Sequence, residues 1–176
     1  MYDVDLKGMS FTQDMLLNGK VKFQQPVKGY RVAIDTVLVA AAVPAVEGSH
    51  VLELGAGVGA ASLCLLARVA GCHVDAIECQ KDLAALARTN AELNGVVSKM
   101  TVYERNILSF SGEFSGKFDH VMINPPYLQP RRASCDAKES ISTVEHDANL
   151  GDWVSVALKA VRRKGSLTFI HRADRL

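Results

Sequence analysis

Hydrophobic and polar positions alternate in blocks along the chain, and these blocks predict strands and helices in turn. Short, nearly continuous apolar runs predict buried strands, whereas apolar residues three and four positions apart predict helices. Glycines follow several of these runs, where a strand or helix is expected to end. The predicted strands are 21–25, 50–54, 73–78, 100–103, 118–123 and 166–171, and the predicted helices are 37–45, 60–70, 81–94 and 152–163.

This alternation predicts an α/β fold of the Rossmann-like type, with a mostly parallel sheet covered by helices. A length of 176 residues is typical of a single domain. We expect a strand and helix segment over residues 1–45 and a cofactor-binding and catalytic core over residues 46–176. The polar stretch 128–149 is long for a connection in a compact domain, which is typical of a functional or disordered loop.

Composition and charge exclude several classes of protein. Hydrophobic residues make up 48% of the chain and charged residues 22%, which argues against disorder. The net charge of +1 shows no overall basic character, so any nucleic-acid interaction must be argued from motifs. No apolar stretch approaches the roughly 20 residues of a membrane span. The four cysteines form no C-x-x-C pair, and five scattered histidines indicate no metal site. We therefore expect a cytoplasmic protein with reduced thiols and no metal or membrane contact.

A glycine loop stands where the strand 50–54 turns into a helix. It consists of Gly55, Ala56, Gly57 and Gly59, and Glu78 follows 19 residues later at the end of the next strand. Such a loop lets a ligand approach the backbone, and a carboxylate at that spacing can accept the ribose hydroxyls of an adenosine-type cofactor. The spacing also fits an NAD-dependent oxidoreductase. Glu53 favours S-adenosylmethionine instead, because a carboxylate there repels pyrophosphate and suits an ammonium group.

At these residues the sequence resembles the class I S-adenosylmethionine-dependent methyltransferases. Glu53 to Gly59 is similar to their first motif, and Glu78 matches their ribose-binding acidic residue. The tetrapeptide Asn124-Pro125-Pro126-Tyr127 is similar to their fourth motif in the branch that methylates amines. The resemblance implies further cofactor contacts from Asn106, Ile107 and Asn124. Asn106 stands where the family usually has an acidic residue.

The segment from Gln25 to Ala40 resembles the bacterial tRNA adenine-N(6) methyltransferases that act on valine tRNA. This resemblance implies methyl transfer to the 6-amino group of an adenine in RNA, with tRNA as the substrate. It also implies further strands after residues 166–171, which would otherwise form an exposed apolar sheet edge. We therefore expect that the chain lacks the last two strands of the full topology and that it is a monomer or a weak dimer.

The tetrapeptide suggests how an unreactive aromatic amine could be activated. The side-chain oxygen of Asn124 and the backbone carbonyl of Pro125 can accept the two hydrogens of the amine and expose its lone pair. Two consecutive prolines, Pro125 and Pro126, hold these groups in place before substrate arrives. Tyr127 offers a face on which the target base can stack.

Several residues and two alternative functions complete the hypothesis. Arg31, Asp35, Arg131 and Arg132 are candidate substrate or cofactor contacts. The tetrapeptide is equally compatible with methylation of a protein glutamine amide, as on a release factor. A second alternative is a module that binds the cofactor without activity because its C-terminal part is missing.

Overall fold

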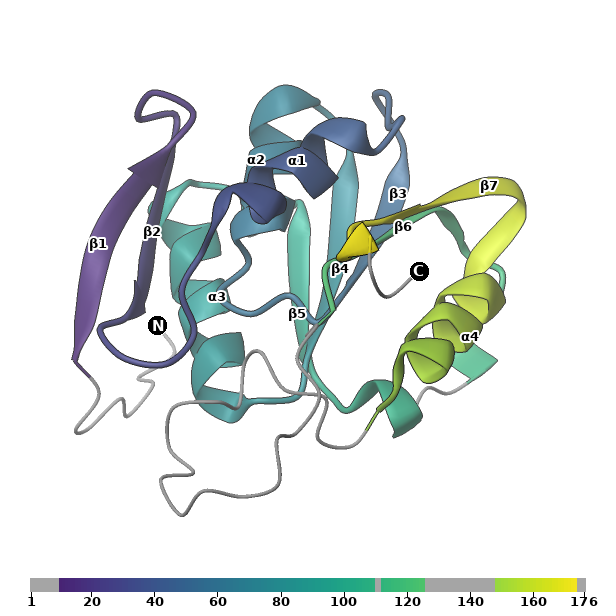
Figure 1. Cartoon of the computed structure of the whole chain (residues 1–176). Helices are drawn as coiled ribbons and strands as arrows, with labels where there is room; N and C mark the ends of the chain where they lie inside the picture. Colours follow the sequence, from purple (N-terminus) through teal and green to yellow (C-terminus); the bar gives the residue numbers. More distant parts are fainter. Residues whose placement is uncertain (1–9, 110–111, 126–147, 174–176) are drawn as a thin grey trace, which may run out of the picture.

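The computed structural model describes residues 10–109, 112–125 and 148–173, and these residues form two sheets (Figure 1). The larger sheet has the strand order β5-β4-β3-β6-β7, with every neighbouring pair parallel. The smaller sheet is an antiparallel hairpin of β1 and β2. The predicted α/β class with a mostly parallel sheet is confirmed. The elements are β1 Phe11–Leu16, β2 Val21–Pro26, α1 Ile34–Ala42, β3 His50–Leu54, α2 Ala60–Arg68, β4 His73–Glu78, α3 Lys81–Leu93, β5 Met100–Glu104, η1 Ile107–Ser109, η2 Gly112–Phe114, β6 Phe118–Ile123, α4 Leu150–Ala160 and β7 Val161–Phe169.

The large sheet separates two clusters of buried side chains. Helices α1, α2 and α3 and the hairpin contribute to one cluster, and α4 with the two short helices η1 and η2 contributes to the other. Side chains of the central strand β3 alternate between the two faces, as a strand requires: Val51 belongs to the first cluster, and Leu52 and Leu54 belong to the second. This alternation directs Glu53 toward the side of α2.

Three strand predictions agree with the structure at both ends. The predicted ranges 50–54, 73–78 and 118–123 are β3, β4 and β6. Most side chains of these strands are buried, on both faces of the sheet, and parallel strands with this burial give a clear sequence signal. They also carry the candidate site at their carboxyl ends.

Two predicted helices, 37–45 and 152–163, differ from the structure at both ends. Helix α1 begins at Ile34, with Ala33 as its N-cap, so Asp35 lies in the first turn instead of before the helix. Helix α4 ends at Ala160, and the next residue opens β7. Residues 162–165 form an irregularity in β7 opposite Asp119, where Arg162 makes an ion pair with that carboxylate at 2.5 Å. The basic run that follows Val161 is therefore part of a strand, not the end of a helix.

The N-terminal hairpin is only half predicted, because β1 is absent from the sequence interpretation. Its turn contains Asn18 and Gly19, both with positive φ, which are favoured residues for a tight hairpin turn. Strand β2 buries Val21 and Phe23 against the domain, whereas the alternate side chains of β1 remain exposed. Within the described residues, no helix has the length and apolar character of a membrane span.

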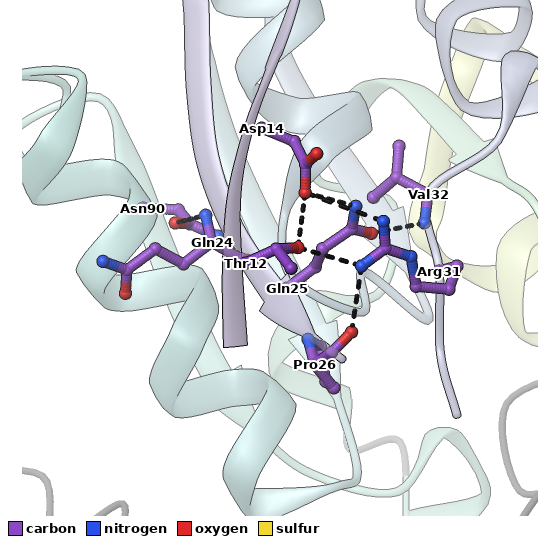
Figure 2. A network of polar contacts seen from close by, with 8 residues as sticks. All are labelled: Thr12, Asp14, Gln24, Gln25, Pro26, Arg31, Val32 and Asn90. Atoms are coloured by element: carbon purple, nitrogen blue, oxygen red, sulfur yellow. Dashed lines mark hydrogen bonds and ion pairs between the residues drawn. The ribbon is translucent and has the colours of Figure 1, made fainter. Parts of the chain in front are cut away.

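A polar network attaches the hairpin to the domain (Figure 2). The Asn90 side chain of α3 accepts from the backbone N–H of Gln24 at 2.7 Å and donates to the Gln24 carbonyl at 2.9 Å. The buried Gln25 amide donates to Asp14 and accepts from the backbone N–H of Val32. The hairpin therefore fixes the start of the segment that leads through Tyr30 into α1.

Candidate cofactor and amine site

Three chain segments meet at the carboxyl edge of the large sheet. Leu54 of β3 pairs with Ile77 of β4 on one side and with Ile123 of β6 on the other. The residues that follow these three positions are Gly55, Glu78 and Asn124, so the structure places the start of the glycine loop between Glu78 and Asn124. Ligands of open α/β sheets bind at this edge, where the strand order reverses.

The glycine loop is held by backbone and side-chain hydrogen bonds. The N–H groups of Gly55 and Ala56 both donate to the Ile77 carbonyl at 2.9 Å. The N–H of Gly57 donates to a carboxylate oxygen of Glu78 at 2.8 Å. Gly57 has φ of 56°, and Gly59 caps α2 in a left-handed conformation, so both positions favour glycine. Hydrogen bonds within the chain and the two glycines therefore set the conformation of the loop.

Glu78 is buried, and both of its carboxylate oxygens accept hydrogen bonds. One oxygen accepts from Gly57, and the other accepts from the backbone N–H of Gln80 at 2.8 Å. Burial raises the pKa of this carboxyl, and the backbone donors partly oppose that shift. Binding of ribose by Glu78 stays a prediction, and the structure adds that Glu78 joins the glycine loop to the end of β4.

Glu53 is also buried and faces the start of α2. One of its oxygens accepts from the backbone N–H and from the hydroxyl of Ser62, which lies in the first turn of that helix. Burial raises the pKa of the Glu53 carboxyl to about 7; the Ser62 hydrogen bonds lower it, and the nearby Glu78 raises it. A cationic group beside Glu53 would relieve this cost, which fits the predicted ammonium partner.

Two aromatic side chains that the sequence interpretation did not assign to the site cover the glycine loop. A Cβ added to Gly57 would lie 2.5 Å from Tyr30, and one added to Gly55 would lie 2.8 Å from Trp153. Burial and the carboxylates Glu53, Glu78 and Asp35 raise the pKa of the Tyr30 phenol, which therefore lies among the acidic groups of the site. Among the residues that the structure describes, the buried indole N–H of Trp153 has no hydrogen-bond partner. Tyr30 lies within the segment from Gln25 to Ala40 whose resemblance is described above, but that resemblance assigned it no role, and no motif includes Trp153.

Asn124 follows β6 and is oriented by a residue 89 positions earlier. Its side-chain nitrogen donates to the Asp35 carboxylate at 3.0 Å, which leaves the amide oxygen as the atom for another donor. Pro125 is buried beside it. Pro126, Tyr127, Arg131 and Arg132 lie outside the described residues. The predicted catalytic roles stay predictions, and Asp35 is brought to Asn124 by α1.

The remaining candidate residues have local partners. The Asn106 side-chain oxygen accepts from the backbone N–H of Leu108 at 2.9 Å, and Ile107 is buried in η1. Arg31 donates to the hydroxyl of Thr12 at 2.9 Å and to the Pro26 carbonyl at 3.2 Å, so it attaches the segment after β2 to the hairpin (Figure 2).

In the described part of the chain, no group of three or more His, Cys, Asp or Glu side chains is arranged to hold a metal.

The fold is that of the class I S-adenosylmethionine-dependent methyltransferases. A solved structure described as a predicted O-methyltransferase from Agrobacterium tumefaciens has 25% sequence identity and a TM-score of 0.63, and the match covers 79% of this chain and 62% of that one. A methyltransferase from Thiobacillus denitrificans, solved with S-adenosyl-L-homocysteine, has a TM-score of 0.55 at 16% identity over 76% of this chain and 46% of that one, and it shows the shared fold alone.

The chain belongs to the methyltransferase small domain family, whose model matches residues 30–171. The predicted family is thereby confirmed, and so is the predicted cofactor of that family, S-adenosylmethionine. It is similar to the tRNA1(Val) (adenine(37)-N6)-methyltransferase of Photorhabdus laumondii, with 33% identity over 57% of this chain and 41% of that protein. It is similar to the enzyme of the same name from Serratia proteamaculans, with 31% identity over 68% of this chain and 48% of that protein. The chain spans about half the length of the curated relatives it matches.

Proposed function

We propose that this protein transfers a methyl group from S-adenosylmethionine to the 6-amino group of an adenine in RNA, with tRNA as the substrate. The single observation that carries the proposal is the position of Asn124. It directly follows β6, beside the glycine loop, and its amide nitrogen donates a hydrogen bond to Asp35. An amide oxygen at this place is suited to accept a hydrogen from an amine. The names of the curated relatives supply adenine and tRNA.

The cofactor's binding site follows from the residues around the glycine loop. Glu53 would pair with the ammonium group, Glu78 would accept the ribose hydroxyls, and the backbone of Gly55 to Gly57 would lie against the amino-acid part. The two buried carboxylates fit a cationic ligand better than a pyrophosphate, because burial already disfavours their charged forms. The bound cofactor would supply a methyl group on a positively charged sulfur.

The chain's own contribution is to prepare the acceptor nitrogen. Hydrogen bonds from the amine to the Asn124 oxygen and the Pro125 carbonyl would draw the nitrogen toward tetrahedral geometry and expose its lone pair to the methyl group. Because neither acceptor changes its protonation state, they act by fixed position. After methylation the nitrogen is acidic and loses a proton to water, so no strong general base is needed. Stacking of the target base on Tyr127 stays a prediction, and tRNA as substrate implies a cytoplasmic enzyme.

Labelled S-adenosylmethionine tests the proposal when tRNA and protein substrates are offered in parallel. We expect label in N(6)-methyladenosine after digestion of the tRNA. Asn124→Ala should abolish transfer while the affinity for the cofactor changes by less than about threefold, since the side chain binds the acceptor and not the loop. Label in a protein glutamine with none in tRNA would replace adenine with the amide substrate. Cofactor binding without transfer to either would identify a binding module.

A further inference from the structure

We propose that Asp35 is a positioning residue that fixes the orientation of the Asn124 amide, so that its oxygen, not its nitrogen, faces the acceptor amine. The inference rests on the proposed function of Asn124 and adds a residue from a distant part of the chain to its mechanism. It also reassigns Asp35 from a candidate contact of substrate or cofactor to a partner of the catalytic side chain.

The orientation of an asparagine amide is decided by its partners, because its oxygen and nitrogen ends have almost the same shape. The Asn124 nitrogen lies 3.0 Å from one oxygen of the Asp35 carboxylate. If the amide were flipped, two oxygen acceptors would face each other at that distance, with no hydrogen between them. The carboxylate therefore selects the single orientation in which the Asn124 oxygen points away from Asp35.

Asp35 is itself held in place by the helix on which it lies. Its second carboxylate oxygen accepts from the backbone N–H of Thr36 at 2.9 Å, in the first turn of α1. A negative group is favoured at this end of a helix. Helix α1 packs through the buried residues Thr36, Val39 and Ala40. The carboxylate is thus anchored at one oxygen and presents the other to Asn124.

The same contact improves Asn124 as an acceptor. A hydrogen bond between an amide N–H and a charged acceptor is stronger than a neutral one, and it polarises the amide so that its oxygen carries more negative charge. The acceptor amine becomes more positive as the methyl group is transferred. The polarised oxygen therefore stabilises the transition state more than the bound substrate, which predicts an effect on kcat and little effect on KM.

The arrangement needs two acceptor atoms at position 35 and one donor at position 124, which allows a test by exchange. In Asp35→Asn the new amide has a single acceptor, so either Thr36 or Asn124 loses its partner. In Asn124→Asp two carboxylates face each other. In the double variant the new amide at position 35 donates to the new carboxylate at position 124 and still accepts from Thr36. The exchange restores every hydrogen bond and leaves a carboxylate oxygen directed at the amine.

The experiment measures kcat, KM for tRNA, cofactor affinity and unfolding midpoint for the wild type, both single variants and the double variant. We expect kcat to fall at least a hundredfold in Asn124→Asp, because loss of one preorganised hydrogen bond costs roughly 10²–10³ in kcat. We expect a smaller fall, at least tenfold, in Asp35→Asn, because Asp35 acts through Asn124. We expect the kcat of the double variant to be at least ten times the kcat of Asn124→Asp. Asp82→Asn is the matched control, because Asp82 is an exposed acidic residue in the first turn of α3.

Two results would overturn the inference. The first is a double variant no more active than Asn124→Asp. The second is a loss of cofactor affinity and of unfolding midpoint in Asp35→Asn that parallels the loss of kcat, since Asp35 would then only support the fold. The wild type shows whether the proposed function itself fails. If the wild type methylates a protein glutamine and not tRNA, the proposed adenine substrate is wrong. The same four proteins are then compared on the glutamine substrate, which still tests the role of Asp35.

Discussion

Cofactor affinity should depend on pH through Glu53. The carboxyl is buried, and its pKa is raised to about 7, so near neutral pH it is only half deprotonated before ligand binds. If the ammonium group of the cofactor pairs with the carboxylate, binding requires the deprotonated form and releases a proton. The sign follows directly: affinity rises as pH rises toward 7 and falls as pH falls below it.

The magnitude follows from the fraction of Glu53 that is deprotonated. With a pKa of about 7, this fraction is about one half at pH 7 and about one thirtieth at pH 5.5. The affinity should therefore fall roughly 16-fold over this interval, which corresponds to about 1.6 kcal/mol. The α-amino group of the ligand stays protonated in this range, because its ordinary pKa is near 8.

The assay is a cofactor titration at pH 5.5, 6.2 and 7.0 with the wild type and with Glu53→Gln. The glutamine keeps an acceptor for Ser62 but cannot titrate, so its affinity should be lower at pH 7 and change less across the range. Glu78 also has a raised pKa, and the difference between the two proteins removes its contribution. S-adenosylhomocysteine, which keeps the ammonium group and lacks the sulfonium charge, should show the same slope. Equal slopes for wild type and Glu53→Gln would refute the pairing.

Further predictions concern the glycine loop and its cover. Gly57→Ala should reduce cofactor affinity at least tenfold in a binding titration, because the new Cβ would lie 2.5 Å from Tyr30 and a φ of 56° is strained for alanine. Adding Tyr30→Ala to the same chain should recover part of the lost affinity. Glu78→Gln should lower the affinity and the unfolding midpoint together, because an amide cannot accept from both Gly57 and Gln80; an unchanged thermal midpoint would argue against the loop role. Trp153 is the single tryptophan of the chain and touches the loop, so its fluorescence should change on cofactor binding, and a titration without a signal would separate it from the site.

The parts of the fold that the sequence predicts are those whose signal is local. Strands β3, β4 and β6 are short, mostly buried segments between polar or glycine-rich ones, and their predicted bounds agree with the structure. The glycine loop and Glu78 are recognisable because a tight strand-to-helix turn requires glycine and the acidic residue follows at a fixed spacing.

The parts that the sequence does not predict depend on contacts between distant residues. Strand β1 is polar and half exposed, so its alternation is too weak to identify it without its partner β2. The sequence indicates Asp35 only as a candidate substrate or cofactor contact, yet its carboxylate accepts from Asn124, 89 positions later. Tyr30 covers Gly57 because the hairpin directs the chain across the loop, and no local pattern indicates that path.

The nucleoside composition of tRNA tests the central claim most directly. The measurement compares cells that lack the gene with the same cells carrying either the wild-type gene or Asn124→Ala. We predict that N(6)-methyladenosine in one tRNA disappears without the gene, returns with the wild type and does not return with the variant. Identical tRNA nucleosides in all three strains would contradict methylation of tRNA adenine by this protein.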